Sequence, residues 1–459
     1  MASTSTGAHV LVYPYPSSGH IIPLLDLTRR LLTRGLTVTL LVTPTDLPLL
    51  QPLTSAHSPP SLQTLAIPTP DFPLSTPNRL IVGIKTMREH HEPALIQWFQ
   101  SHGSSVVAIV SDFFLGWTRD LAERVGVKRI VFSPSGACGQ SLSFALWRDL
   151  PKINGGDKPD DVDSPVEFPG LPNSPIYPWW QIPQLYRNGE EGDAIWEFYR
   201  GVNLANIASW GFVFNSYSKL EGIYLDHVKK VVGHDRVWAA GPLLPDRRDT
   251  SDRGGPNSMP RHEIMTWLDS RNDDSVVYVC FGSRVTLTSV QAEVLTTALE
   301  QSGVHFVLSV RVSDDQVRNV IRNGYEERVS DKGLVIRGWA PQVAILGHRA
   351  VGTFLTHCGW NSVMEGLSAG IVMLTWPMAS DQFTNAKLVV DHLGAGIRVG
   401  EGTRVIPEPD ELARVLVGSL EPSGLERVRA KEMSDAAKEA VEGGSSEKDL
   451  DELVKSLMS

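Results

Sequence analysis

The chain has 459 residues and a formal net charge of −10 at pH 7, with 42% hydrophobic and 20% charged residues. This length and composition are typical of a globular protein with two or more domains, each with a sizeable core. The acidic balance argues against a general nucleic-acid binder and against a protein that adheres to anionic membranes, because both need a basic face.

The ends of the chain and its cysteines indicate where it works. The amino terminus has no basic segment followed by a long apolar run, and no window approaches the roughly 18 apolar residues that span a bilayer. The three cysteines, Cys138, Cys280 and Cys358, form no CxxC pair, which excludes a zinc knuckle or a disulfide framework and favours a reducing compartment. We therefore expect a cytoplasmic protein with no integral membrane segment.

The first elements predict a doubly wound sheet. Residues 9–13 and 36–43 are buried-strand patterns that each end at a proline, and a helical pattern separates them. The loop PYPSSG after the first strand has neither the G-x-G-x-x-G spacing nor the lysine of a P-loop, which argues against a plain NAD or ATP site.

Two polar residues in this half each follow a predicted strand. His20 lies at the start of the first predicted helix, and Asp112 follows the strand predicted over residues 106–110. His20 could be a surface histidine near a helix start, and Asp112 could be only a helix N-cap. Alternatively both side chains enter one crevice, where the carboxylate orients the imidazole and makes it a usable general base.

The remainder of the first half contains one long irregular segment. Residues 151–183 are rich in proline, glycine and acidic residues and include Trp179 and Trp180. Such segments are usually functional or disordered, and the aromatic residues favour an ordered role, either lining a pocket or clamping the surface. The regular elements predicted around it are a strand over 128–133, helices over 137–150 and 195–208, and strands over 211–215 and 236–241.

A polar segment rich in proline and glycine, residues 244–260, predicts a linker. A second α/β series follows it, with strands over 276–281, 304–310 and 334–336 and a helix over 289–302. We therefore expect an α/β protein with two doubly wound domains facing a cleft, residues 1–243 and 261–443. Residues 444–459 are predicted to form a helix that packs back on the first domain.

The segment from Trp339 to Gln382 places polar side chains where apolar strands give way to helices. In open α/β sheets such junctions bind ligands, so this segment predicts one wall of a ligand site. A metal or Cys–His nucleophile at His357-Cys358 is disfavoured, because adjacent residues seldom converge on one ligand and no other Cys or His has metal-ligand spacing. Asp161-Val162-Asp163 matches a metal-binding D-x-D but lies in the irregular segment, so we interpret it as a solvated turn and expect no metal.

The motifs WAPQ, THCGWNS with a glutamate three residues later, TWP and a final Asp-Gln match a known signature in order and spacing. They closely resemble the box of plant family 1 UDP-sugar-dependent glycosyltransferases. The similarity covers the whole chain, including SSGH, Asp112 and FGS at residues 281–283, and looks most like the flavonol and small-phenolic branch. The resemblance implies the GT-B fold, with two Rossmann-like domains and a cleft between them.

The resemblance also implies a donor site in the second domain. Trp339 would stack on uracil and the Ala340 backbone would read its edge, while Gln342 and Glu365 would hold the ribose. The residues implied for the diphosphate are Ser283, His357, Asn361 and Ser362, and those for the sugar are Trp360, Asp381 and Gln382. Because Asn361 and Ser362 open a helix, free N–H groups there favour a phosphate.

In the family the histidine at the position of His20 is the general base and Asp112 its partner, which implies inverting, metal-independent transfer from a UDP-sugar co-substrate with no cofactor. Gln382 resembles the glucose-using pattern. Val372 and Met364 stand where the family usually has proline and leucine, and neither change affects a polar contact. The acceptor residues expected in loops are Tyr15, Phe114, Ser135, Trp147, Trp179, Ala379 and Ser380.

We therefore expect a monomeric UDP-glucose-dependent transferase acting on a small phenolic acceptor. Other donors, such as UDP-rhamnose or UDP-xylose, and C-glycosylation are alternatives on the same fold. A UDP-sugar epimerase would turn over donor without acceptor, and a non-catalytic binder would not need His20 and Asp112.

Overall fold

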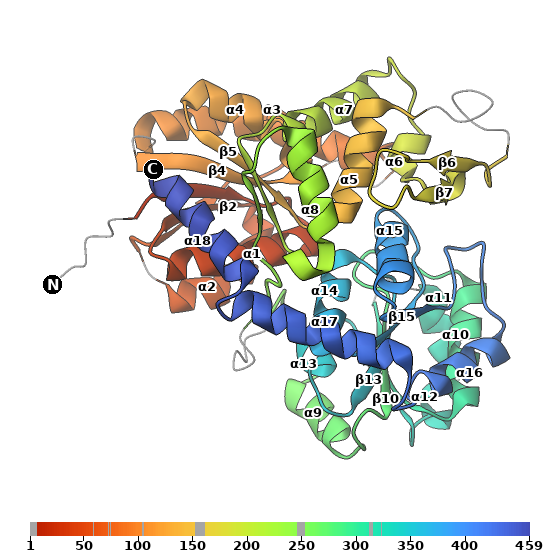
Figure 1. The fold of residues 1–459 in the computed structure, drawn as a ribbon. Helices are drawn as coiled ribbons and strands as arrows, with labels where there is room; N and C mark the ends of the chain where they lie inside the picture. Colours follow the sequence, from red (N-terminus) through yellow and green to blue (C-terminus); the bar gives the residue numbers. More distant parts are fainter. Residues whose placement is uncertain are drawn as a thin grey trace. The chain divides into compact units, whose positions relative to one another are not determined.

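The computed structural model describes residues 7–57, 59–71, 73, 75–102, 105–151, 161–245, 253–311, 315–322 and 324–459. The chain divides into two compact units: unit 1 comprises residues 1–245 and 440–459, and unit 2 comprises residues 246–439. Each unit is built on one parallel sheet with helices around it (Figure 1), which confirms the predicted α/β class. Residues 152–160 of the irregular segment and 246–252 of the predicted linker lie outside the described residues.

Unit 1 has a seven-stranded parallel sheet in the order β3-β2-β1-β4-β5-β8-β9. The strands are β1 His9–Tyr13, β2 Thr37–Val42, β3 Leu62–Ala66, β4 Val106–Asp112, β5 Lys128–Ser133, β8 Gly211–Phe214 and β9 Val237–Ala239. The strand order reverses between β1 and β4, which opens a crevice at the carboxyl ends of these two strands. A separate antiparallel hairpin consists of β6 Pro165–Glu167 and β7 Ile176–Pro178.

The helices of unit 1 connect these strands. They are α1 Ser18–Thr33, α2 Gln51–Ala56, α3 Arg79–His102, α4 Thr118–Val125, α5 Ala137–Phe144, α6 Gln184–Arg187, α7 Ala194–Ile207, α8 Ser218–Val232 and, at the carboxyl end of the chain, α18 Ser445–Met458. The last of these, drawn in dark blue in Figure 1, lies beside β9. Its Asp449 carboxylate accepts a hydrogen bond from the Ala239 N–H at 2.7 Å.

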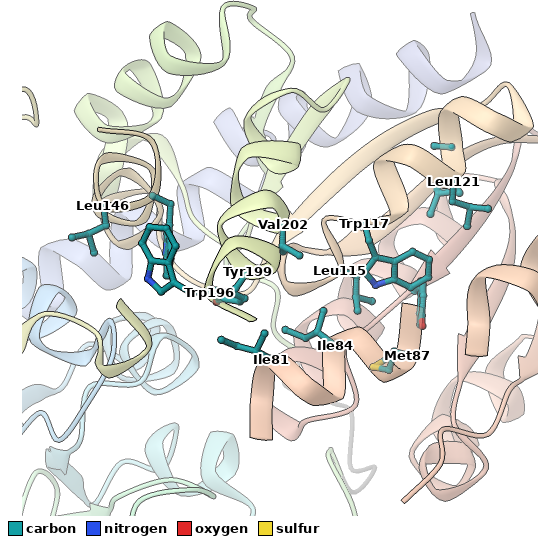
Figure 2. Packing of buried hydrophobic residues seen from close by; sticks show 14 of the residues in the cluster. Ile81, Ile84, Met87, Leu115, Trp117, Leu121, Leu146, Trp196, Tyr199 and Val202 are labelled. Carbon is teal, nitrogen blue, oxygen red and sulfur yellow. The ribbon is translucent and has the colours of Figure 1, made fainter. Parts of the chain in front are cut away.

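Apolar faces of α3, α4 and α7 close the core on one side of this sheet. Figure 2 shows Ile84 of α3 pointing toward Val202 of α7, with Leu115 nearby. All three are at most 3% exposed, and each such buried side chain stabilises the fold by about 1.5–3 kcal/mol. This core holds α7 against the segment that follows β4.

Unit 2 repeats the doubly wound plan with six parallel strands in the order β12-β11-β10-β13-β14-β15. The strands are β10 Val276–Cys280, β11 His305–Val310, β12 Gly333–Arg337, β13 Val351–Thr356, β14 Val372–Thr375 and β15 Gly396–Arg398. The helices are α9 Arg261–Asp269, α10 Ser289–Ser302, α11 Asp315–Arg322, α12 Tyr325–Arg328, α13 Gln342–Leu346, α14 Trp360–Ala369, α15 Gln382–Lys387, α16 Pro409–Gly418 and α17 Leu425–Val441, whose last two residues fall in unit 1. Here the order reverses between β10 and β13.

Several predicted elements have the observed bounds, including the strands over 9–13 and 128–133 and the helix over 289–302. The helix predicted over 137–150 is α-helical only to Phe144 and continues as a π-helical segment, Ala145–Asp149. The turn predicted at Asp161 is present, with its carboxylate accepting from the Asp163 N–H at 2.9 Å. Within the described part of the chain, no helix is long and apolar enough to cross a membrane.

Candidate active site

His20 and Asp112 meet where the strand order of unit 1 reverses. His20 lies in the first turn of α1, directly after β1, and Asp112 is the last residue of β4. The Nδ1 atom of His20 lies 2.8 Å from Oδ2 of Asp112. An ionised carboxylate can only accept, so Nδ1 carries the proton and Nε2 is the nitrogen that can take one. Asp112 is fully buried, whereas 15% of the His20 side chain is exposed.

The Asp112 carboxylate also accepts a second hydrogen bond. Its Oδ1 atom accepts a hydrogen bond from the Phe114 N–H at 2.9 Å, so the residue also caps the short 3-10 turn Phe113–Leu115. Asp112 is therefore an N-cap through one carboxylate oxygen and contacts the His20 imidazole through the other. Because two bonds fix the carboxylate, its orientation toward the imidazole is set by the backbone.

Aromatic rings surround the His20 imidazole. Phe113 and Phe114 stack on it with ring centroids 5.7 and 4.7 Å away, and Tyr15 meets it edge-on at 5.4 Å. Tyr15 also contacts Phe114 edge-on at 5.2 Å. A flat apolar ligand would find complementary faces beside this imidazole.

The residues expected to line the acceptor pocket fall into three groups. Tyr15 and Phe114 contact His20, as described above. Trp147 and Trp179 are buried, at 4% and 7% exposure, and are connected to Phe114 by ring contacts that run through Tyr199 and Tyr186. Ser135 is buried, and its carbonyl accepts from the Ser133 hydroxyl at 2.8 Å, while Ala379 and Ser380 are exposed residues of unit 2.

In unit 2 the corresponding reversal, between β10 and β13, brings His357 against two glycines. A Cβ atom added at Gly282 or at Gly359 would approach the His357 Nε2 atom to 2.6 or 2.5 Å, so only glycine leaves room for the ring. Burial lowers the pKa of His357 to about 4, although a backbone bond to Cys280 acts in the opposite direction. Its Nδ1 atom is buried and has no hydrogen-bond partner among the described residues.

Helix α14 starts directly after this histidine, at Trp360. Within the described residues no side chain caps its first turn, whose N-cap is Gly359. The first N–H groups of a helix without such a cap attract anions, and Asn361 and Ser362 belong to this turn. Ser283 is exposed and follows Gly282 on the β10 side of the reversal.

Gln342, Ser362 and Glu365 form one hydrogen-bond network. The Gln342 side-chain amide donates to the Ser362 hydroxyl at 3.1 Å and to the Glu365 carboxylate at 2.7 Å. Its carbonyl accepts from the Tyr278 hydroxyl at 3.2 Å. The other Glu365 oxygen pairs with the Arg253 guanidinium. Gln342 and Glu365, the two residues expected at the ribose, are therefore bonded to one another, and Gln342 also contacts Ser362, one of the four residues expected at the diphosphate.

The indole of Trp339 is fixed by the segment that precedes α9. Its ring N–H donates to the Arg253 carbonyl at 3.1 Å, and its backbone N–H donates to the Ser258 hydroxyl at 2.7 Å. The Ser258 N–H in turn bonds the Trp339 carbonyl at 2.9 Å. Arg253 and Ser258 were not predicted as site residues, because both lie in a polar segment that reads only as a linker.

The end of the segment from Trp339 to Gln382 forms a compact turn. The Gln382 side-chain carbonyl accepts from the N–H groups of Met378 and Ala379 at 2.9 and 3.0 Å. This leaves its NH₂ group for a further acceptor. The Asp381 carboxylate accepts from the Asn385 amide at 3.2 Å. In the described part of the chain, no cluster of three His, Cys, Asp or Glu side chains has the arrangement of a metal site.

Two parallel-sheet α/β units, each with polar side chains where its strand order reverses, are typical of the GT-B fold. Residues 239–405 match the model of the UDP-glucoronosyl and UDP-glucosyl transferase family. A flavonol 3-O-glucosyltransferase of Arabidopsis thaliana is 48% identical over 99% of this chain and 97% of its own length. UDP-glycosyltransferase 89B2 of Stevia rebaudiana is 47% identical over 100% of this chain and 99% of its own.

Among solved structures, Arabidopsis thaliana UGT89C1 complexed with UDP-L-rhamnose has a TM-score of 0.82 and 37% identity, covering 99% of this chain and 100% of the other. The chain therefore belongs to the family of plant UDP-glycosyltransferases.

Proposed function

We propose that this UDP-glycosyltransferase transfers glucose from UDP-glucose to a hydroxyl group of a flavonol or another small phenol, with inversion at the anomeric carbon. The observation that carries the proposal is the 2.8 Å contact between His20 Nδ1 and Asp112 Oδ2, which leaves Nε2 available as a base among aromatic rings. A phenol suits this base better than an alcohol, because its ordinary pKa is near 10.

The chemistry needs one proton transfer and one displacement. Nε2 of His20 takes the proton of the acceptor hydroxyl as that oxygen bonds to the anomeric carbon, and the bond from this carbon to the β-phosphate oxygen breaks. UDP leaves with the electron pair, and Asp112 stabilises the imidazolium that forms. The N–H groups at the start of α14 would stabilise the departing diphosphate.

The donor assignment rests on Gln382 and on the relatives. The turn that fixes its carbonyl leaves the side-chain NH₂ to donate to a sugar hydroxyl, and glutamine at this position resembles the glucose-using pattern. The 48% identical relative is a glucosyltransferase. UDP-rhamnose is the second candidate, because the similar crystal structure contains UDP-L-rhamnose.

A matched assay tests donor and acceptor together. The purified protein would be incubated with UDP-glucose, UDP-rhamnose or UDP-xylose and with a panel of flavonols, simple phenols and aliphatic alcohols, with products identified by mass spectrometry. We expect the highest kcat/KM for UDP-glucose with a phenol. Turnover of UDP-glucose without acceptor, or transfer only to alcohols, would contradict the proposal.

The base assignment gives the first prediction. His20→Ala should lower kcat by roughly 10²–10⁴-fold, the usual contribution of a positioned general base. UDP affinity measured by calorimetry should stay the same, because the residues proposed to hold UDP belong to unit 2. His102→Ala, at an exposed histidine of unit 1, is the matched control and should keep full activity. Full transfer by His20→Ala would show that another group is the base.

A further inference from the structure

A buried arginine lies beneath the His20–Asp112 pair. Arg129 is the second residue of β5, next to β4 in the sheet, and is 2% exposed. Its Nε atom donates to the hydroxyls of Ser111 and Thr118, both at 3.1 Å. Burying a guanidinium destabilises a fold unless its N–H groups are hydrogen-bonded, so the partners of Arg129 show what its burial supports.

The remaining donors of this guanidinium point to helix α7 and to the end of β4. One terminal nitrogen donates to the Asn206 amide oxygen at 2.8 Å and to the Ser209 hydroxyl at 2.6 Å. The other lies 3.5 Å from the Asp112 carbonyl oxygen. The single side chain therefore connects β4, α4 and α7.

Asn206 carries this connection to the residues that surround the base. Its NH₂ group donates to the Phe113 carbonyl at 2.8 Å. The segment Asp112–Leu115, called here the base-support turn, contains the carboxylate that bonds His20 and both phenyl rings that stack on it. Just after this turn, a Cβ atom at Gly116 would approach the Val202 carbonyl of α7 to 2.1 Å. The turn is thus hydrogen-bonded to α7 through Phe113, and the residue directly after the turn packs closely against the same helix.

We propose that Arg129 and Asn206 form a clamp that positions the base-support turn, and through it the His20 imidazole. The proposal rests on the role proposed above for His20. Arg129 touches neither substrate nor the reacting atoms, so it is a positioning residue. The clamp contacts the main chain of the turn at two consecutive carbonyls, those of Asp112 and Phe113, while the Asp112 side chain bonds the imidazole.

Charge supports the same assignment. Burial lowers the pKa of Arg129 to about 9, and the negative charge of Asp112 acts against this shift. The arginine bonds otherwise to neutral oxygens of Ser111, Thr118, Asn206 and Ser209. The nearby Asp112 carboxylate therefore favours the charged form of the buried guanidinium.

Two substitutions of different severity test the clamp. Arg129→Met removes the cation at similar length, and Asn206→Ala releases the Phe113 carbonyl without removing a charge. We expect kcat to fall roughly 10- to 100-fold in Arg129→Met and about 3- to 10-fold in Asn206→Ala, because small displacements of a base are costly. The affinity for UDP should remain within twofold of wild type in both variants.

Asn203 provides a matched control on the same helix. It is equally buried, one turn before Asn206, and bonds the Tyr199 carbonyl and the Ser143 hydroxyl instead of the base-support turn. Asn203→Ala should lower the thermal midpoint about as much as Asn206→Ala, yet keep the wild-type kcat. Equal losses of kcat in the two variants would show that only helix packing matters and would overturn the proposal.

Acceptor acidity separates a misplaced base from a general loss of structure. A nitrophenol needs less help to lose its proton than an unsubstituted phenol, so the defect of Arg129→Met and of Asn206→Ala should shrink with the more acidic acceptor. A defect that is the same for both acceptors would contradict positioning of the base.

A double-substitution cycle gives the final check. If Arg129 acts through Asp112 and the base-support turn, adding Arg129→Met to Asp112→Asn should lower kcat less than twofold further. Independent, multiplicative losses would overturn the clamp.

If circular dichroism shows that Arg129→Met does not fold, the comparison of Asn206→Ala with Asn203→Ala decides the question. A wild type inactive toward every phenol would instead refute the proposed function, whereas active clamp variants would refute the clamp alone.

Discussion

Two histidines near the carboxyl end of β1 have opposite surroundings. His20 is bonded to the Asp112 carboxylate and is partly exposed. His91 of α3 is fully buried between two hydroxyls, with Tyr13 at 2.6 Å from Nδ1 and Thr69 at 3.0 Å from Nε2. Desolvation lowers the pKa of His91 to about 4, against 6.5 for an ordinary histidine. The neighbours of the imidazole, more than its place in the fold, decide which of the two suits a base.

The depressed pKa of His91 predicts how stability depends on pH. Between pH 6.5 and 4 the unfolded chain binds a proton at this residue and the folded chain does not, so the free energy of unfolding falls as the pH falls. From pH 8 to pH 5 the contribution of His91 should decrease by about 2 kcal/mol. Urea unfolding at both pH values should therefore show a weaker pH dependence for His91→Gln than for wild type. The exposed His102→Gln should behave like wild type, and an unchanged dependence in His91→Gln would contradict the assignment.

For individual residues, the sequence predicts the polar side chains that follow strands. It misses the buried or distant side chains that hydrogen-bond to them. The His20–Asp112 contact was predicted as one of two alternatives, because each residue follows a predicted strand, and the structure shows them bonded. Arg129 was missed because a basic residue early in a strand resembles an exposed edge position. Arg253 was missed because its contact with Glu365 joins positions more than a hundred residues apart, and local patterns do not report on such pairs.

Helix α18 shows how one element combines strong and weak contacts. Its apolar side, Leu450, Leu453 and Leu457, is buried in unit 1, and Asp449 accepts the Ala239 N–H of β9. Burial raises the pKa of the Asp449 carboxyl. Asp451, which bonds the Arg34 side chain at 2.7 Å, is 62% exposed.

These two aspartates on one helix should differ in their effect on stability. Asp449→Ala leaves a strand N–H group buried without its acceptor, which should lower the free energy of unfolding by about 1–3 kcal/mol. Asp451→Ala removes an exposed ion pair and should cost less than about 1 kcal/mol. Urea unfolding of both variants, at low and at high salt, measures the difference. A larger loss in Asp451→Ala would mean that the ion pairs, not the strand contact, fasten this helix.

Among the strands, the sequence predicted those that are buried on both faces and missed one that is not. The apolar runs of β1 and β5 are fully or almost fully buried, and their bounds could be read from the sequence. Strand β3 was not predicted, because this edge strand exposes most of its residues and carries no continuous apolar run. Helix α3 was also missed, since an internal proline and many polar residues interrupt its pattern.

At the scale of the whole molecule, the two units share one topology but place different side chains where the strand order reverses. Both reverse their strand order at a central strand pair, and both place a histidine there, His20 after β1 and His357 after β13. In unit 1 a carboxylate supports the ring, whereas in unit 2 the ring packs on two glycines beside an uncapped helix start. The first arrangement suits proton transfer, and the second suits an anion.

This division predicts where the nucleotide will stabilise the chain. UDP at 100 times its dissociation constant should raise the free energy of unfolding by about 2.7 kcal/mol. In hydrogen-exchange experiments the added protection should lie at residues 339–342 and 357–365, while α3 and α7 exchange as in the free protein. UMP lacks the β-phosphate, so it should protect residues 339–342 but leave the first turn of α14 less protected than UDP does. Equal protection of that turn by UMP and UDP would mean that the start of α14 does not bind the diphosphate, and the leaving group would need a different donor.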